Sequence, residues 1–293
     1  MIKIVERTKI WFTLSLTVII AGILFIAIKG LNYGIDFKGG TLLNIGMNKE
    51  ITVHDKKDLN DILKQYTKQY SIRDINNKKE FEIIIQSGAV KDEQISEIKN
   101  KVKDKFKLGN KYLVNEENIG GSVGKELTKK ACMAMVLAAG AMLIYITIRF
   151  EVDFAFAAIM ALLHDVLITI SVYAILGIKV NSPFIAAILT ILGYSINDTI
   201  VVFDRIRENK KKLGKVSLDV LVDTSINQTI KRSINTSLST LITIIALLIL
   251  VPSIREFTLP LTVGIAVGTY SSIFIASPIW VLFKKHKLKA LKA

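Results

Sequence analysis

Cysteine is nearly absent from this 293-residue chain, which has only Cys132. One cysteine excludes an intrachain disulfide, and because Cys132 lies in an apolar run we expect a buried small residue there rather than a reactive thiol. Aromatic residues are also few, at 8%, and the basic residues behind the formal net charge of +14 form no aromatic-studded patch. A nucleic-acid-binding surface is therefore not expected.

Hydrophobic residues, by contrast, make up 51% of the chain. Six apolar runs approach the roughly 20 residues that span a bilayer. They cover residues 10–28, 131–148, 154–176, 183–203, 234–251 and 258–283. The first run is longer than the apolar part of a signal peptide and no A-x-A-like cleavage site follows it, so we interpret it as a retained anchor. The sequence predicts a polytopic α-helical membrane protein with six transmembrane helices.

Lysine and arginine are unevenly placed around these runs. They precede the first run, follow the sixth and crowd the segment between the fourth and fifth, whereas the short loops on the opposite side carry only Lys179 and Arg255. Basic short loops stay in the cytoplasm, which predicts that both termini are cytoplasmic. The expected parts are an N-terminus with the first helix (1–29), an extracytoplasmic domain (30–130), a five-helix membrane region (131–283) with a cytoplasmic loop (204–232), and a basic tail (284–293).

The segment 30–130 is lysine-rich, but long segments translocate largely regardless of charge. Its pattern is that of a small α+β domain. Strands are predicted at 42–47, 71–75, 81–86 and 112–115, helices at 55–70 and 92–106, and a polar turn at 76–77. The order βαββαβ is ferredoxin-like. Because no His, Cys or carboxylate cluster within it indicates catalysis, we expect a module for binding or for transmitting motion.

Glycines mark both ends of this domain. The first stretch, G-I-D-F-K-G-G-T at 34–41, has three glycines within seven residues and predicts an irregular connection to the membrane region. Its spacing fits neither common nucleotide-binding pattern, so nucleotide binding is rejected. The second stretch, I-G-G-S-V-G-K-E-L at 119–127, predicts either a hinge or a plain linker.

Polar and ionisable side chains lie in or directly before three of the apolar runs. Asn197 and Asp198 lie in the fourth, His164 and Asp165 in the third, and Arg232 stands at the start of the fifth. A carboxylate at membrane depth is costly and is kept where it faces a partner or a water-filled cavity. We expect these polar faces to pack together, so that Arg232 neutralises or releases Asp198 and protons pass between them. A fixed ion pair, or an Arg232 bound to lipid headgroups, is the alternative.

Small residues indicate where the helices approach one another. Gly264, Gly268 and Ser272 recur at four-residue intervals in the sixth run. Such a face predicts tight packing against another helix, in this chain or in a partner. Gly193, four residues before Asn197, predicts a second close approach in the fourth run.

Three motifs, in this order, closely resemble those of the SecF family of the bacterial Sec protein-export machinery. They are G-I-D-F-K-G-G-T at 34–41, A-L-L-H-D-V-L at 161–167 and G-Y-S-I-N-D-T-I-V-V-F-D-R-I-R-E-N at 193–209. The resemblance covers the extracytoplasmic domain and all six spans. It implies a non-enzymatic subunit, half of an RND-like fold, that acts with SecD beside the SecYEG channel and uses the proton motive force to promote preprotein translocation.

The same resemblance assigns roles to residues. It implies that Asp198 and Arg232 form the proton relay, with Asn197, Asp165 and His164 as further members. Gly34, Asp36, Gly39 and Gly40 belong to the family's motif at the domain junction. No cofactor or metal site is expected, and a SecD carboxylate would complete the relay from another chain.

Other functions fit part of the pattern. An RND-like exporter half for a small molecule or lipid would have similar spans but a bulkier extracytoplasmic region. An intramembrane aspartyl protease using Asp165 and Asp198 would need two carboxylates that share a proton, and its G-x-G-D motif is missing. A purely structural subunit of the translocon would tolerate the loss of Asp198. The coupling ion, proton or sodium, is left open.

Overall fold

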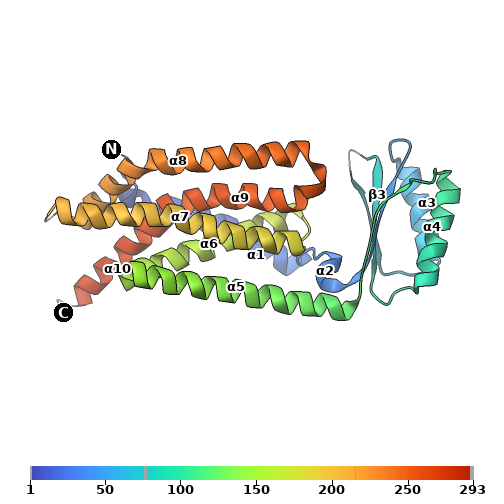
Figure 1. The fold of residues 1–293 in the computed structure, drawn as a ribbon, viewed down its shortest axis with the longest axis horizontal. Helices are drawn as coiled ribbons and strands as arrows, with labels where there is room; N and C mark the ends of the chain where they lie inside the picture. Colours follow the sequence, from blue (N-terminus) through green and yellow to red (C-terminus); the bar gives the residue numbers. More distant parts are fainter. Residues whose placement is uncertain (1, 76–77, 215, 291–293) are drawn as a thin grey trace. The chain divides into compact units, whose positions relative to one another are not determined.

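The computed structural model describes residues 2–75, 78–214 and 216–290. The chain forms two compact units, one made of Met1–Asn32 with Met133–Ala293 and the other of Tyr33–Cys132. The first is helical and the second contains the only sheet in the described part of the chain (Figure 1). The turn predicted at residues 76–77 lies outside the described residues.

Among the described residues, six helical stretches are long and apolar enough to cross a membrane. Each predicted apolar run falls within one of them to within a residue, so a polytopic helical membrane protein is confirmed. The stretches are α1 (Thr8–Lys29, after the 3-10 turn η1, Val5–Arg7), α5 (Gly121–Arg149), α6 (Val152–Leu176), α7 (Ser182–Lys212), α8 (Leu218–Leu250), and a composite of η2 (Pro252–Ile254), α9 (Arg255–Ser271), the π-helical η3 (Ser272–Ala276) and α10 (Ser277–Ala290).

The segment 204–232, predicted as a cytoplasmic loop, is mostly helical. Helix α7 continues to Lys212 and α8 already begins at Leu218. Glu208 accounts for part of this extension, because its carboxylate pairs with Arg205 at 2.6 Å and with Lys212 at 2.5 Å. Pairs at these spacings stabilise a helix in water, so α7 does not end where its apolar run ends.

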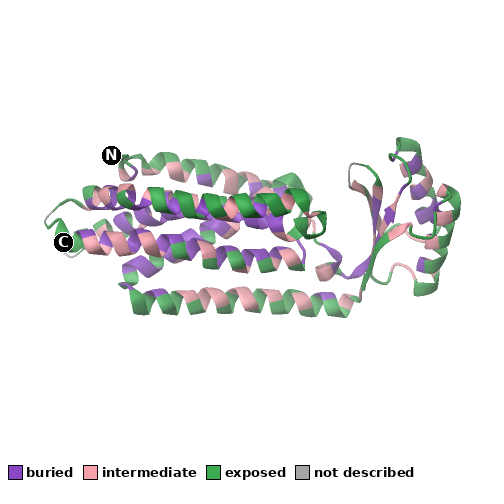
Figure 2. Ribbon diagram, turned by 45° about the horizontal axis from the view of Figure 1, so that its top comes forward, coloured by how far each residue is buried: buried purple, intermediate pink, exposed green. Residues whose placement is uncertain are grey.

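Helix α5 is also longer than predicted and lies largely exposed. The glycine stretch at 119–127, predicted as a hinge or linker, enters the helix at Gly121, whose N–H donates to Ser87 Oγ at 3.2 Å. Figure 2 shows few buried residues along α5, and only 6% of its most apolar stretch is buried, against 50% in α6. Cys132, expected to be buried, is exposed for this reason.

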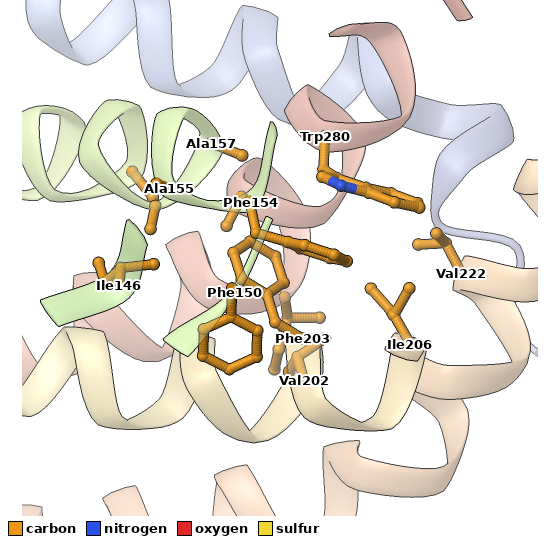
Figure 3. Packing of buried hydrophobic residues seen from close by; sticks show 14 of the residues in the cluster. Ile146, Phe150, Phe154, Ala155, Ala157, Val202, Phe203, Ile206, Val222 and Trp280 are labelled. Carbon is orange, nitrogen blue, oxygen red and sulfur yellow. The ribbon is translucent and has the colours of Figure 1, made fainter. Parts of the chain in front are cut away.

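The core of the helical unit joins α6, α7 and α10 through aromatic side chains. The rings of Phe154 and Trp280 stack with centroids 4.7 Å apart and planes inclined by 12°. Phe203 lies 4.8 Å from Phe154, and Phe150 packs beside both (Figure 3). Trp280 and Phe203 are fully buried, so this cluster fixes one end of α10 against the α6–α7 pair.

The small-residue face of the sixth stretch packs against α7 of the same chain. A Cβ added at Gly264 would lie 2.1 Å from Ile191 Cδ1, and one at Gly268 would lie 3.0 Å from Ser195 Cβ. The predicted close approach of this stretch is therefore confirmed. Gly193 is different, because it is exposed and a Cβ there would meet nothing within 4 Å, so in the described part of this chain no helix makes the close approach predicted at Gly193.

The second unit contains a four-stranded antiparallel sheet on which two helices pack. Its elements follow the predicted order βαββαβ, and the strand order is β2-β3-β1-β4. After the short α2 (Ile35–Lys38) come β1 (Gly40–Gly46), α3 (Val53–Lys64), β2 (Tyr70–Ile75), β3 (Glu80–Gln86), α4 (Asp92–Phe106) and β4 (Leu113–Ile119). Figure 1 shows α3 and α4 on the same face of the sheet.

The apolar residues of this unit match the periodicity of the sequence. Leu59 and Leu63 of α3 and Ile98 and Val102 of α4 are buried against the sheet. Helix α3 ends at Lys64, six residues before the predicted end, because the chain must turn and straighten to begin β2 at residue 70. The predicted helix was too long at its C-terminal end, because the helical periodicity of apolar residues does not show where the next strand begins to pair.

Candidate functional site

Asp198 lies where three membrane-spanning helices meet. Its side chain, on α7, is 3% exposed, and its Oδ2 accepts a hydrogen bond from Ser237 Oγ of α8 at 3.1 Å. Ser237 in turn accepts a hydrogen bond from Thr269 Oγ1 of α9 at 2.5 Å. A buried polar group needs a partner in an apolar surrounding. The three side chains therefore form a short chain of exchangeable protons that ends at a carboxylate.

Arg232 and Asn197 lie near these three hydrogen-bonded side chains but form no hydrogen bond with them in the described structure. In the described structure Arg232 is exposed and forms no ion pair with Asp198, on which its charge acts only at longer range. Asn197 is exposed too. Tyr194 links the two helices by donating to the Thr236 carbonyl oxygen at 3.1 Å. The structure brings α7 and α8 together as expected, but the α8 face that meets Asp198 carries serine rather than arginine.

Asp165, on α6, is the more deeply buried carboxylate, with no exposed surface. Its Oδ2 accepts hydrogen bonds from Ser195 Oγ of α7 at 2.5 Å and from Ser271 Oγ of α9 at 2.9 Å. Its Oδ1 lies 3.0 Å from His164 Nδ1. This carboxylate holds three spanning helices together through hydroxyl donors and a neighbouring imidazole.

His164 extends the Asp165 network to α1. Its Nε2 lies 2.8 Å from Ser15 Oγ, and the Ser15 hydroxyl also reaches Tyr270 Oη of α9 at 3.4 Å. Tyr270 then donates to the carbonyl oxygen of Trp11 at 2.8 Å. A continuous polar path thus runs from the centre of the helical unit to its first helix, through an otherwise apolar interior.

A π-helical turn shapes the α9 side of the site. The segment η3 begins at Ser272, directly after Ser271. Ser271 donates to Asp165, while the next hydroxyl, Ser272 Oγ, lies 2.9 Å from Thr199 Oγ1 of α7. π-helical turns are rare and are frequent at functional sites. Here the turn adjoins two successive serines that both make contacts inside the helical unit.

The two carboxylates have separate surroundings. Asp165 is bound by Ser195 and Ser271, whereas Asp198 is bound by Ser237, and in the described residues no hydrogen-bond donor is common to both. An aspartyl protease needs two carboxylates that share a proton. The arrangement does not provide that pair. Nor, within the described ranges, do three or more His, Cys, Asp or Glu side chains come together to hold a metal ion.

The glycine motif at 34–41 forms a closely packed backbone connection between α2 and β1. Gly34 precedes α2, and Asp36 lies in its first turn, partly buried. Gly39 and Gly40 have φ of 73° and 140°, which side-chain-bearing residues rarely adopt. A Cβ at Gly40 would also lie 2.3 Å from the carbonyl oxygen of Ile85 on β3. The motif turns the chain from α2 into β1 at close backbone contact.

Hydroxyl residues that the sequence analysis did not assign to the site also contribute to these hydrogen bonds; of them, only Ser272 was noted, as part of a packing face. They are Ser15, Ser195, Ser237, Thr269, Ser271 and Ser272, and four of these are below 4% exposed. Each stands inside an apolar helix, where a serine or threonine usually bonds to its own helix backbone. The sequence signal available for them was their spacing from the ionisable residues, such as Ser195 three positions before Asp198. That spacing does not reveal which neighbouring helix a hydroxyl contacts.

These features define a polytopic membrane protein whose spanning helices enclose two hydroxyl-bound carboxylates, joined to a small α/β unit through a glycine junction. A family model described as "Protein export membrane protein SecD/SecF, C-terminal" matches residues 97–286, and one described as "SecD/SecF GG Motif" matches residues 24–50. The chain belongs to the SecF family of protein translocase subunits, as an accessory subunit of the Sec translocase.

Individual relatives support this assignment. The protein translocase subunit SecF of Sebaldella termitidis is 40% identical over 291 residues, covering 98% of this chain and 93% of its own. That of Dictyoglomus turgidum is 40% identical and covers 92% of each chain. The crystal structure of SecDF, a translocon-associated membrane protein from Thermus thermophilus, superposes with a TM-score of 0.87 at 36% identity, over 97% of this chain and 39% of that longer chain.

Proposed function

We propose that this subunit couples proton movement across the bacterial inner membrane to preprotein translocation, with Asp198 as the group that binds and releases the proton. The observation that carries the proposal is the burial of Asp198 between α7, α8 and α9 with one hydroxyl donor, Ser237. A carboxylate at this depth is costly and is kept for a functional reason. Protonation of Asp198 would change the hydrogen bond that it makes with Ser237, so the packing of the three helices would depend on its protonation state.

Arg232 is the second member of the proposed relay. It stands on α8 one turn before Thr236 and five residues before Ser237, exposed and unpaired with Asp198 in the described structure. Arg232 and Ser237 are about 7.5 Å apart along the helix axis. A rotation of α8 with a shift along its axis, bringing Arg232 beside the carboxylate in place of Ser237, would favour the deprotonated form of Asp198. The absence of a direct pair in the described part argues for this exchange over a fixed ion pair.

A partner subunit would cover the polar face that α7 and α8 leave exposed. Polar residues in spanning helices face protein or water rather than lipid. The exposed polar residues on these helices include Asn197, Arg232, Asn235, Thr236, Ser239 and Thr243. The solved relative is a SecDF chain of which this chain spans 39%. We therefore propose that SecD packs on this face and supplies the other half of the relay.

Asp165 and His164 would serve the relay indirectly. Their hydrogen bonds tie α6 to α1, α7 and α9, and Ser195, which donates to Asp165, lies on the same helix as Asp198. A change in the protonation of either residue would therefore alter the hydrogen bonds that hold the helix carrying Asp198. In this proposal Asp165 and His164 position the moving helices, and Asp198 exchanges the proton.

The placement of the remaining parts follows from charge and topology. The basic residues around α1, the α7–α8 connection and α10 support cytoplasmic termini. The βαββαβ unit, with strand order β2-β3-β1-β4, has the ferredoxin-like arrangement and would then be extracytoplasmic. There it would contact the preprotein as it leaves SecYEG and transmit helix movement to it, through the glycine junction that contains Gly39 and Gly40.

The test is export of a signal-peptide reporter in cells whose only copy carries Asp198→Asn, with the proton gradient intact or collapsed by an ionophore. We expect normal insertion and loss of the gradient-dependent part of export. Asp204→Asn is the matched control, because it makes the same change on α7 at a half-exposed carboxylate paired with Arg207 at 2.8 Å. It should leave export unchanged.

Two outcomes would replace the proposal. If Asp198→Asn inserts normally and its export keeps the full gradient dependence, the chain acts as a structural subunit. If export is normal but transport of a small molecule or lipid is lost, an exporter function replaces it. A dependence on the sodium gradient in place of the proton gradient, abolished by Asp198→Asn, would keep the relay and change the coupling ion.

A further inference from the structure

A groove runs along α1 on the helical unit. At the start of the helix a cavity of about 620 Å³ lies between α1, the first turn of α8 and α10. Further along, a second cavity of about 280 Å³ lies between α1, α6 and the η3–α10 segment. Both are lined by Phe12 and Leu16, so the two cavities adjoin, and together they make the groove that follows the chain from Val5 to Ile19.

The groove has the length of one lipid leaflet. The fourteen helical steps from Val5 to Ile19 rise about 21 Å at about 1.5 Å per residue. Half of a bilayer with its headgroups measures about 20–22 Å. α1 is itself one of the six stretches apolar enough to cross a membrane. A groove of this length on a spanning helix therefore fits one phospholipid lying parallel to it.

Its polarity changes along its length as that of a phospholipid does. The inner end is apolar apart from Ser15 and His164, which bind each other at 2.8 Å. All four charged residues that line the groove, Glu6, Lys9, Asp219 and Lys285, lie at the other end. The headgroup would lie there, with an acyl chain over Phe12 and Leu16.

The charge at this end favours a phosphate. Glu6 is paired with Lys3 at 2.8 Å, and Asp219 is paired with Lys285 at 2.7 Å. Lys9 is the lining cation for which the described residues provide no acidic partner. An ammonium near the membrane surface attracts anionic lipid by about 1 kcal/mol, or about five-fold in occupancy.

We propose that this groove binds one anionic phospholipid of the leaflet that α1 enters, with Lys9 on its phosphate and its acyl chain against Phe12 and Leu16. This site is distinct from the Asp198 relay, although the wall at its inner end includes His164. The bound lipid would fill the space between α1 and α10 that the chain's own side chains leave open.

The test is native mass spectrometry of the purified full chain after exchange from vesicles with equal amounts of phosphatidylglycerol and phosphatidylcholine. We expect one strongly retained phosphatidylglycerol. Lys9→Gln should lower its occupancy about five-fold relative to phosphatidylcholine. Lys211→Gln, an exposed lysine at the end of α7 that does not line the groove, should not.

A second pair of variants tests the apolar part of the groove. Leu16→Trp should displace the retained lipid whatever its headgroup, because the larger side chain fills the space that both cavities share. Leu14→Trp is its control, since Leu14 is about equally exposed but lines neither cavity. Equal losses for the two lysine variants, or full retention in Leu16→Trp, would overturn the proposal. Circular dichroism identifies any variant that fails to fold.

Discussion

The contact between α9 and α7 at Gly264 gives the sharpest stability prediction. A Cβ there would lie 2.1, 2.4 and 2.9 Å from Cδ1, Cγ1 and Cγ2 of Ile191, so the side chain cannot escape by moving its tip alone. Overpacking a well-packed core costs about 1–3 kcal/mol. Alanine recovers about 1 kcal/mol of helix propensity. With three conflicting atoms we take the upper end of the overpacking cost, about 3 kcal/mol. After subtracting the gain in helix propensity, Gly264→Ala should lower the free energy of unfolding by about 2 kcal/mol.

Ile191→Ala provides the decisive comparison. Alone it should cost about 2–5 kcal/mol through the cavity that it leaves. In the double variant the methyl group introduced by Gly264→Ala enters that cavity without a steric conflict. The loss in the double variant should therefore be about 3 kcal/mol smaller than the sum of the two single losses. The assay is reversible unfolding in mixed micelles, followed by circular dichroism. Gly193→Ala is the control, because nothing lies within 4 Å of its Cβ position. The reasoning fails if Gly264→Ala is as harmless as Gly193→Ala, or if the losses are additive.

Two further predictions concern the α/β unit and the aromatic core. Burial raises the pKa of Asp55, but hydrogen bonds from Lys49 and Thr52 outweigh this effect and hold the pKa at about 2. The lowered pKa contributes about 2 kcal/mol to the free energy of unfolding above pH ~4, and this contribution is lost as the pH falls towards ~2. Hydrogen exchange of residues 33–132 should show the loss of stability at low pH. An equal acid dependence in Asp55→Asn would contradict the prediction. Trp280→Ala should cost about 3–5 kcal/mol in the micelle assay, because the ring is fully buried on Phe154; a loss below ~1 kcal/mol would contradict the packing described.

Much of this fold follows from local sequence patterns. The apolar runs predicted the spanning helices, and the periodicity of Leu59, Leu63, Ile98 and Val102 predicted the faces that α3 and α4 bury. These features depend on residues close together in the chain, where composition and period decide the outcome. Helix ends were less predictable, because ion pairs such as Glu208 with Lys212 carry α7 beyond its apolar run.

The site was predictable in its ionisable residues but not in their partners. Asp198 and Asp165 stood out because carboxylates are rare in spanning helices. Their hydroxyl donors come from distant parts of the chain: Ser237 lies 39 residues from Asp198, and Ser271 lies 106 residues from Asp165. Which serine of a helix meets which carboxylate depends on the rotation of packed helices, and that rotation also turned Arg232 outward.

The central claim is that Asp198 takes up and releases a proton, and infrared spectroscopy of the carboxyl C=O band tests it directly. The full chain, in vesicles, is titrated with acid and compared with Asp198→Asn, Ser237→Ala and the control Asp204→Asn. The account predicts one component of the protonated-carboxyl absorption that is missing in Asp198→Asn, shifts in Ser237→Ala because its hydrogen bond is lost, and persists in Asp204→Asn. A titration that is the same in Asp198→Asn as in the unaltered chain would show that Asp198 exchanges no proton.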